Sequence, residues 1–496
     1  MMKFILVILI LIIVALLLVG NKSVSGGAEV ESVDIHHNLA YLNDLNYNES
    51  IEKVLQEDQK VVQYTDELPS TSLKYKLTKD DFRHLIHIGQ LKLFLSEVEF
   101  LTERLKSHKD KVVMVYAGSS PCHHASYLSK MFPNLKMVLI DPSEHLVYYP
   151  DEKSGYDKEY IEENLYFKCA TGNRFGVSDR KVNMFNKGVV QRPSGGDEFD
   201  KLIAAKDYKP IINAILNTKH KYYIIEDYFT NNLAELFAEM GKSTDFVFVS
   251  DIRSALTEGR GDVKDIDILW NSAMQYNWTK IMQPSAAMFK FRCTYFDMRP
   301  HEIFDYANRQ PYKSDFELAR RNGIDFIGNF KRRIFEYFKP DNVYIQAFPG
   351  EDSTETRLVV SKDKSHGYKD IQKFNCDELE RKFFQYNKIQ RVYGYHTGYE
   401  KIIDPNLGLD ACGDCALMVK IFSDYYKKFG KVDLSVIKKD IEDIMKVLRR
   451  NFREESTHGM FTKKYKNIGD VIEDQTNNLV YSLYLKHKTT LLNNFR

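Results

Sequence analysis

The chain has 496 residues, of which 43% are hydrophobic and 28% charged, with 31 Tyr and 31 Phe. This composition excludes an intrinsically disordered protein and is typical of an aromatic-rich globular one. The 70 basic and 69 acidic residues leave a net charge of +1, so a nucleic-acid partner would have to bind in a local basic groove. The 6 cysteines form no regular framework, which favours a reducing compartment.

The N-terminal segment, residues 1–25, is hydrophobic. No charge occurs from Phe4 to Gly20, and a helix over these residues would be about 25 Å long. That length is marginal for a bilayer and long for the core of a signal peptide. We therefore expect a signal anchor, with residues 4–20 in contact with a membrane. The alternatives are a cleaved signal peptide and an extended start of the reading frame. Residues 26–79 read as a linker and an N-terminal arm.

The stretch VVMVYAGSSPCHH, from Val112 to His124, predicts a buried strand that stops at Gly118. A second buried strand, 137–140, leads into Asp141. In a doubly wound sheet the ligand crevice lies at the carboxyl ends of the strands, where a glycine lets the backbone approach a ligand and an acid can bind ribose hydroxyls. The pair suggests a nucleoside-containing cofactor. Two of the three fingerprint glycines are absent, so an ordinary α/β core is an equally good interpretation.

Further along the chain, apolar residues at helical spacing predict a helix from about residue 80 to 101. Asp251 and Arg253 follow the predicted strand 246–249, again at a strand end. Lys290 interrupts an apolar strand, 288–293, and a solvated sheet edge is the simplest explanation. More strands are predicted at 222–225, 343–348 and 356–361, and helices at 266–277, 329–339 and 434–448.

These elements predict an α/β fold, with a main domain at 80–395, inserts near 146–220 and 298–342, and a helical extension at 396–496. The pair Cys412 and Cys415 lacks a second pair at zinc-binding spacing, so we predict no metal site.

Seven stretches, taken in order, resemble the poxvirus-type cap-specific mRNA (nucleoside-2′-O-)-methyltransferase family, whose members are also the small regulatory subunit of the viral poly(A) polymerase. They are GQLKLFLSEVEFL (89–101), VYAGSSPCHHASYL (115–128), VLID (138–141), FVFVSDIRS (246–254), PSAAMFKFRCTYFD (284–297), TETRLVV (354–360) and LERKFFQYNKI (379–389). The resemblance implies a Rossmann-like S-adenosylmethionine-dependent methyltransferase sheet with helices on both faces.

The resemblance also implies roles for particular residues. The family's catalytic Lys-Asp-Lys-Glu set falls on Lys92, Asp251, Lys290 and Glu355. The residues implied to bind S-adenosylmethionine are Gln90, Tyr116, Gly118, Asp141 and Phe229. Two departures stand out: Cys122 replaces a second glycine of the family motif, and Ser143 replaces an arginine.

The family clamps the 7-methylguanine of the cap between aromatic rings, with carboxylates at the edge of the base. Tyr295, Asp297 and Glu380 match this pattern, and the first aromatic is Tyr64 or Tyr75. Stacked rings and carboxylates favour the methylated base because methylation gives guanine a positive charge. For the RNA body we expect a groove lined by Arg253, Arg260 and the basic run Lys331, Arg332 and Arg333, which would contact phosphates without reading sequence.

Together these residues imply transfer of a methyl group from S-adenosylmethionine to the ribose 2′-hydroxyl of the first transcribed nucleotide of capped mRNA. We expect Lys290 to act as the base, with Lys92 as the neighbouring cation that helps to free it of its proton. The alternative is a non-catalytic RNA-binding, processivity subunit of a viral poly(A) polymerase, with the catalytic subunit as its partner. A membrane-tethered small-molecule methyltransferase is a third hypothesis. The family works in the cytoplasm of infected cells, where no membrane anchor is expected.

Overall fold

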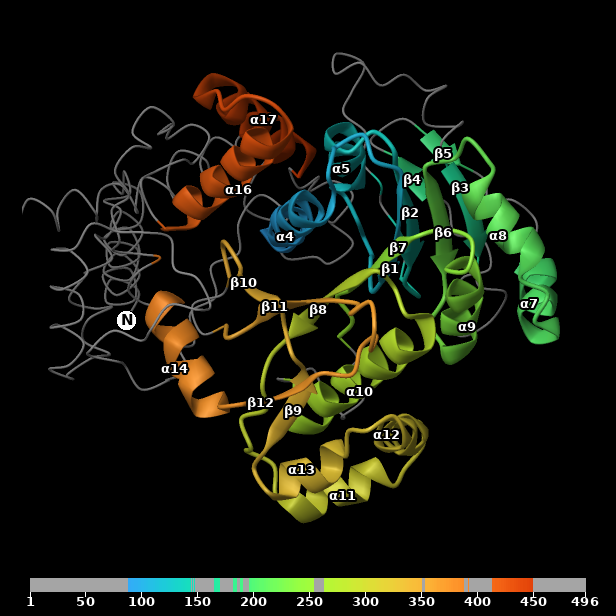
Figure 1. Ribbon diagram of the computed structural model, residues 1–496, viewed down its shortest axis with the longest axis vertical. Coiled ribbons are helices and arrows are strands. Elements are labelled where there is room, and N and C mark those ends of the chain that lie inside the picture. Colours follow the sequence, from blue (N-terminus) through green and yellow to red (C-terminus); the bar gives the residue numbers. More distant parts are fainter. Residues whose placement is uncertain are drawn as a thin grey trace, which may run out of the picture.

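The computed structural model describes residues 88–143, 145, 147, 165–169, 182–184, 188–190, 196–253, 263–349, 353–387, 391 and 413–448. Its centre is an eight-stranded sheet with the order β10-β11-β8-β7-β1-β2-β6-β3 (Figure 1). The strands are β1 (Val112–Ala117), β2 (Leu135–Ile140), β3 (Leu165–Cys169), β6 (Tyr222–Glu226), β7 (Phe246–Ser250), β8 (Ala286–Phe291), β10 (Asn342–Ile345) and β11 (Thr356–Ser361).

The strands from β3 to β8 in this order pair in parallel, and β11 pairs antiparallel with both β8 and β10. The chain leaves β1 for β2 on one side and later returns to β7 on the other, so the strand order reverses at β1. In open sheets of this type, ligands bind outside the carboxyl ends of the strands at that reversal.

Strand β1 shows why both faces of the sheet are covered. All of its residues are buried, and they alternate between two hydrophobic clusters: Val113 and Val115 belong to one, Met114 and Tyr116 to the other. A strand that is apolar on both sides needs helices on both sides. The expected Rossmann-like α/β fold is confirmed.

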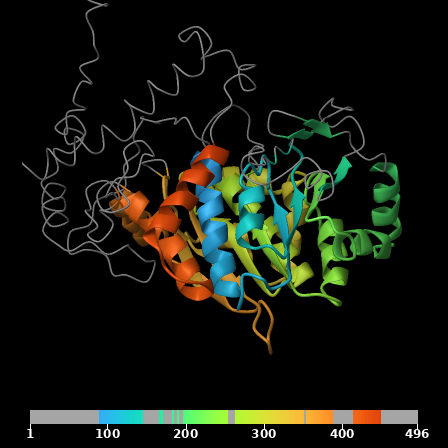
Figure 2. The same cartoon turned by 90° about the horizontal axis from the view of Figure 1, so that it is seen from above.

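One face is covered by α4 (Ile88–Arg104), α5 (Ala125–Met131), α16 (Gly413–Phe429) and α17 (Leu434–Val447). Helix α16 packs against α4, and the two lie side by side when the molecule is seen from above (Figure 2). Polar contacts help to fix the C-terminal pair: Tyr127 donates to Asp440 Oδ1 at 2.7 Å, and Tyr425 donates to the Met131 carbonyl at 2.8 Å. The helix predicted at 434–448 is confirmed.

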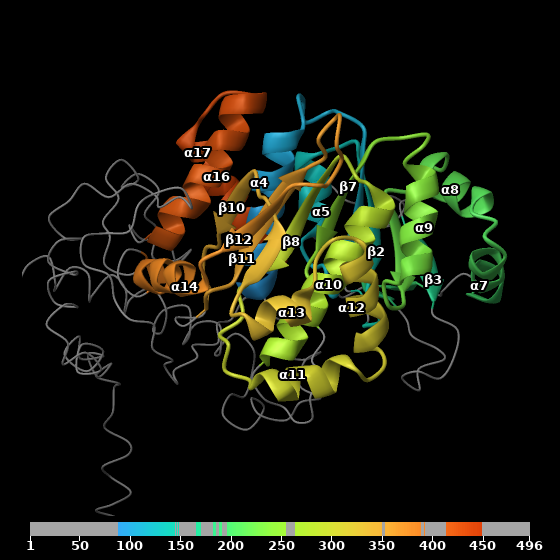
Figure 3. The same cartoon turned by 60° about the horizontal axis from the view of Figure 1, so that its bottom comes forward.

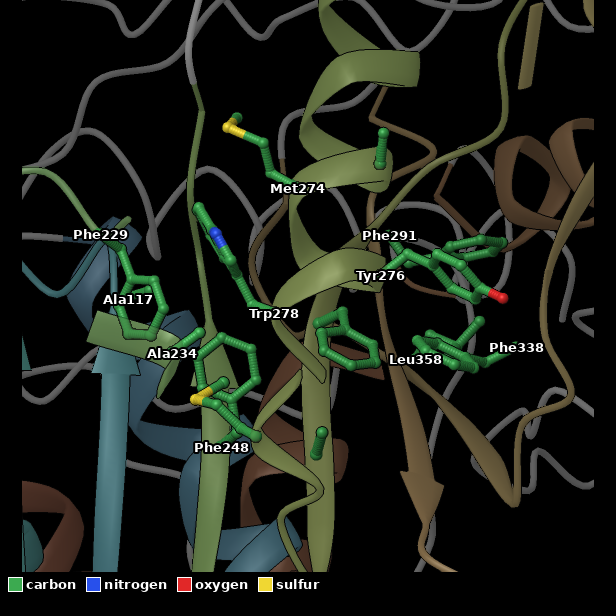
Figure 4. Close-up of a cluster of buried hydrophobic side chains, with 14 of the residues drawn as sticks. Ala117, Phe229, Ala234, Phe248, Met274, Tyr276, Trp278, Phe291, Phe338 and Leu358 are labelled. Carbon is green, nitrogen blue, oxygen red and sulfur yellow. The ribbon is translucent and has the colours of Figure 1, made fainter. Parts of the chain in front are cut away.

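The opposite face carries α9 (Asn231–Met240) and α10 (Asp265–Met282), with α7 (Gly196–Ala205) and α8 (Lys209–Leu216) beside them. A group of three short helices packs against α10: α11 (Pro300–Ala307), α12 (Tyr312–Arg321) and α13 (Phe326–Lys331) (Figure 3). The core between the sheet and α10 is aromatic, with Phe229 4.6 Å from Trp278 and 5.5 Å from Phe248 between ring centroids (Figure 4).

The helix predicted at 329–339 is wrong. Helix α13 ends at Lys331, Arg333 adopts a left-handed φ of 55°, and strand β9 (Phe335–Phe338) begins soon after. Strand β9 pairs with β12 (Ile371–Phe374), which the sequence did not suggest. Burial of Phe335 and Tyr337 on alternate positions outweighs the helical preference of the charged residues before them.

The insert near 146–220 has a structural role, because β3 extends the main sheet beyond β6. It also contains the hairpin of β4 (Val182–Met184) and β5 (Gly188–Val190). The predictions for residues 1–25 and 26–79, and for Tyr64, Tyr75 and Arg260, lie outside the described residues. Within the described part, no helix combines the length and hydrophobicity needed to cross a membrane.

Candidate active site

The carboxyl ends of β1, β2 and β7 meet closely. The amide of Gly118 donates to the Ile140 carbonyl at 2.8 Å, and the amide of Asp251 donates to the Ala117 carbonyl at 2.9 Å. Strand β8 is parallel to β7, so Lys290 lies at the same edge of the sheet. Because β11 runs the other way, its first residues lie there too. The topology thus brings residues from distant parts of the sequence to one edge.

A cluster of charged side chains occupies this edge. Lys290 Nζ lies 3.3 Å from Asp251 Oδ1 and 3.5 Å from Glu355 Oε2. Arg357 contacts the same two carboxylates, at 2.6 Å from Asp251 and 3.3 Å from Glu355. Arg253 lies 2.6 Å from Glu355. The side chains of Lys290, Asp251 and Glu355 are 15%, 15% and 14% exposed, so the cluster is shielded but reachable.

Lys92, on α4, is half-buried at the same place. Burial lowers the pKa of its ammonium group; the carboxylate of Glu355 opposes the change, and the cations Arg357 and Lys290 add to it. The pKa of Glu355 lies well below its usual range, since the cations around it, Lys290 first, outweigh a burial that acts to raise it. Burial therefore favours the neutral form of Lys92.

Two arginines belong to the cluster although the sequence analysis gave neither a place in it. Arg357 is two residues after Glu355, a spacing that puts both side chains on one side of a strand, and this signal could have identified it. Arg253 was predicted to line the RNA groove, but it is bound to Glu355. With both arginines counted, the six residues comprise four cations and two anions, so the cluster carries excess positive charge when every group is ionised.

The turn after β1 is built differently from the expectation. Gly118 has a φ of +78°, and a Cβ there would lie 2.7 Å from the backbone nitrogen of Ile252. The glycine therefore leaves space for the backbone that follows β7. The prediction had assumed that this space was needed for a ligand. Cys122 also has a left-handed φ, of 55°, which explains why glycine suits that position. Its side chain is 1% exposed and packs in the core.

The residues implied to bind a cofactor surround this turn. The Asp141 side chain accepts from the Ser143 amide at 2.7 Å, and burial raises its pKa while that hydrogen bond opposes the rise. Within the described residues, the buried hydroxyl of Tyr116 has no hydrogen-bond partner. A carboxylate at a strand end fits a ligand that carries ribose hydroxyls, and the orphaned hydroxyl of Tyr116 comes from the end of the neighbouring strand.

Two other predicted cofactor residues have structural contacts. The Gln90 side-chain oxygen accepts from the His123 amide at 3.0 Å and lies 3.2 Å from His124 Nδ1, so Gln90 ties α4 to the turn after β1. Phe229 is 8% exposed and packs in the aromatic core below α10 (Figure 4). Their contacts with a cofactor remain predictions.

The predicted cap-binding residues lie around the loop after β8. The buried carboxylate of Asp265 holds this loop, because it accepts from the amides of Tyr295 and Asp297 at 2.8 Å each. Between them Phe296 has a φ of 56° and packs on Phe330, 5.1 Å away between ring centroids. A left-handed phenylalanine is strained, and the Asp265 hydrogen bonds keep it in place.

Tyr295 connects this loop to the charged cluster. Its hydroxyl lies 3.2 Å from Thr354 Oγ1, next to Glu355 in the chain. Glu380 comes from α14 (Cys376–Gln385), and burial raises its pKa to about 8. The carboxyl of Asp297 is exposed. These side chains share one neighbourhood, because the charge of Asp297 adds to the rise in the pKa of Glu380.

The basic run after α13 is exposed, as the groove prediction requires. Arg332 donates to Asn329 Oδ1 at 2.6 Å, and the guanidinium of Arg333 lies 4.8 Å from the centre of the Phe296 ring. The run therefore adjoins the Tyr295 loop. Contact of Lys331, Arg332 and Arg333 with RNA remains a prediction.

A family model matches part of this chain. Residues 57–150 match the family model described as poly A polymerase regulatory subunit. In the described part of the chain, this range includes α4, which carries Lys92, α5, and the strands β1 and β2, which lead into Gly118 and Asp141. A search of curated proteins gives no match. Residues 57–150 are thus similar to the poly(A) polymerase regulatory subunit family.

Proposed function

We propose that the chain transfers a methyl group from S-adenosylmethionine to a ribose 2′-hydroxyl of capped RNA. The observation that carries the proposal is the meeting of Lys290, Asp251 and Glu355 at one sheet edge, with Lys92 beside them. These four residues come from four separate elements, and a solvated sheet edge does not explain their convergence. Shielded lysines placed between carboxylates are suited to moving a proton at a fixed point.

Asp141, Tyr116 and the turn at Gly118 are the residues that would hold the methyl donor. The donor supplies a methyl group on a sulfonium, which is already activated for transfer. The protein then has to hold the ribose hydroxyl in line and take its proton. The charged cluster lies next to this turn, since the Asp251 amide is bonded to the last residue of β1.

The proton acceptor is a lysine of the cluster, and we assign the role to Lys290. Its Nζ is fixed by two carboxylates, so its position is well defined. Burial lowers the pKa of Lys92, and the charge of Lys290 adds to this lowering. Arg253 and Arg357 compensate the charges of the two carboxylates.

Cap recognition in this proposal uses the face of Tyr295 and the carboxyl of Glu380. A positively charged base gains from stacking on a tyrosine ring. Its charge would also favour the ionised form of Glu380, whose pKa burial raises to about 8. The hydroxyl of Tyr295 reaches Thr354, beside Glu355, so a base on this ring would lie near the proposed catalytic cluster.

A second candidate is a non-catalytic RNA-binding subunit of a poly(A) polymerase, for which the family match is direct support. Cys122 also favours this role, because a left-handed cysteine stands where the methyltransferase motif has glycine. A poly(A) polymerase catalytic subunit is the partner that this role implies. One chain could have both roles. A methyl-transfer assay distinguishes them, because the non-catalytic role involves no methyl transfer.

The test is transfer of a tritiated methyl group to capped RNA that lacks 2′-O-methylation. We expect the wild-type chain to label this RNA and Lys290→Ala to lose at least about 100-fold of the rate. Lys313→Ala, which removes an exposed lysine from α12, should keep the full rate. If the wild-type chain binds the RNA without labelling it, the methyl-transfer proposal is contradicted and the non-catalytic role is favoured.

A further inference from the structure

The guanidinium of Arg292 lies on the ring of Tyr295. Its Cζ is 4.4 Å from the ring centroid, within the range of a cation–π contact. The proposed function assigns this ring to a base that carries a positive charge. An internal cation therefore occupies the position that the charged base would take.

Arg292 has few other bonds at this position. Its Nη2 donates to the Val263 carbonyl at 3.3 Å, a long hydrogen bond. Its Nε is buried without a hydrogen-bond partner among the described residues. An unpaired buried N–H of a charged group costs free energy. The contact with the Tyr295 ring is therefore the main attraction that holds the guanidinium. A ligand that competes for the ring can displace the Arg292 side chain.

Glu380 is the second sign of a ligand site here. Its Oε1 is buried and has no hydrogen-bond partner in the described part of the chain. The charge of Arg292 reaches this carboxyl, since it opposes the burial that raises the pKa of Glu380. A planar cation with N–H groups on its edge would satisfy Oε1, which the Arg292 side chain leaves unpaired.

Strand geometry links this contact to the charged cluster. Lys290 lies on β8, and Arg292 follows directly after the last residue of that strand, about 7 Å further along the chain. Because the cluster carries excess positive charge, a displaced Arg292 side chain would stay near it only together with an anion. A capped RNA would bring phosphates, which an arginine binds readily.

We propose that Arg292 is an internal competitor that occupies the Tyr295 ring until a planar cationic base displaces it, and so sets the affinity of the site. This inference rests on the proposed recognition of a methylated base by Tyr295. In this inference Arg292 opposes binding of the base to the Tyr295 ring. Removal of the Arg292 charge should therefore tighten that binding.

The test measures the dissociation constant of 7-methylguanosine for the full chain by titration calorimetry. The nucleoside has no phosphate, so a change at Arg292 cannot act through phosphate attraction. Arg292→Gln keeps a planar polar group on a shorter side chain but removes the charge, and it should bind about fivefold more tightly than the wild type. Arg292→Lys keeps the charge, and its affinity should stay within about twofold of the wild type.

Equal or weaker binding by Arg292→Gln would overturn the competitor role, provided that thermal unfolding shows the variant to be folded. Tyr295→Leu separates this failure from failure of the proposed function. If Tyr295→Leu abolishes binding while Arg292→Gln leaves it unchanged, the ring site stands and only the competitor is refuted. If Tyr295→Leu binds like the wild type, the cap site and the competitor both fail.

Discussion

Lys290 and Arg357 stand directly opposite each other on neighbouring antiparallel strands. Two like charges at such a pair of positions destabilise a sheet. Here the carboxylates of Asp251 and Glu355 each contact both cations. The two acids therefore have a structural role as well as the proposed catalytic one, and the cluster depends on every member.

Replacement of Arg357 by Met tests this dependence. The variant removes the closest cation of Asp251 and one of the cations of Glu355, so we expect the free energy of unfolding to fall by about 3 kcal/mol. We also expect methyl transfer to fall by at least about 100-fold, because Asp251 and Glu355 lose their positions. Urea denaturation and the transfer assay measure the two effects.

The matched control is Arg357→Lys, which keeps the charge but loses the planar fork that reaches both carboxylates. It should recover part of the stability and little of the rate. Unchanged urea denaturation in Arg357→Met would show that the arginine is not needed to hold the acids.

At the level of elements, α4 has two separate duties. Its first turns supply Gln90 to the turn after β1 and Lys92 to the charged cluster. Its last turns carry Glu99 and Glu103 toward α16 and β10, where Tyr344 donates to Glu103 Oε2 at 2.7 Å. A change in the packing of α16 on α4 can therefore shift Gln90 and Lys92, because the same helix carries them.

Glu99 gives this packing a pH dependence. Burial raises the pKa of Glu99 from 4.5 to about 8, with Lys420 of α16 opposing the rise. Between these two values the folded chain keeps a proton that the unfolded chain releases, so stability falls as the pH rises through this window. Glu99→Gln removes the effect. We expect the variant to gain about 2 kcal/mol over the wild type between pH 5 and pH 9.

Denaturation of both proteins at the two pH values measures this gain. Glu317→Gln, at an exposed position on α12, should show no such gain. A wild type that unfolds in parallel with Glu99→Gln at both values would contradict the buried, protonated state of Glu99.

Much of the element pattern could be predicted, because buried strands leave a local signal. The strand ends that carry Asp141 and Asp251 were found from short apolar runs followed by an acid. Strand β9 was not, because the charged residues around Lys331 suggested a helix and its aromatic residues are held by β12, a distant partner. Local patterns contain no information about such pairing.

The site was predictable only in part for the same reason. Lys290 and Glu355 came from the family resemblance, and nothing in their own surroundings in the sequence joined them. Arg253 was assigned to RNA because the sequence does not show that the end of β7 and the start of β11 lie at the same edge of the sheet. The reason why a glycine is needed at position 118 also differs from the prediction, since the close neighbour is the backbone of Ile252. Both the ion pair of Arg253 and the contact at Gly118 depend on the topology of the sheet.

At the level of the whole molecule, the sheet is a frame that brings distant residues to one edge. Helices on both faces fix its strands, and the C-terminal pair α16 and α17 completes one of those faces. The cluster and the Tyr295 loop lie at neighbouring positions along this edge and are joined through Thr354. A substrate with a charged base at one end and a reactive hydroxyl further along suits this layout.

The most direct measurement is the position of the methyl group that the chain adds. Capped RNA is incubated with the full chain and S-adenosylmethionine, digested to nucleosides and cap fragments, and analysed by mass spectrometry. We predict one added methyl group on the ribose 2′-oxygen of the nucleotide next to the cap, and none with Lys290→Ala. RNA that the wild-type chain binds but leaves unmethylated, or methylates equally well without Lys290, would contradict the assignment of the cluster.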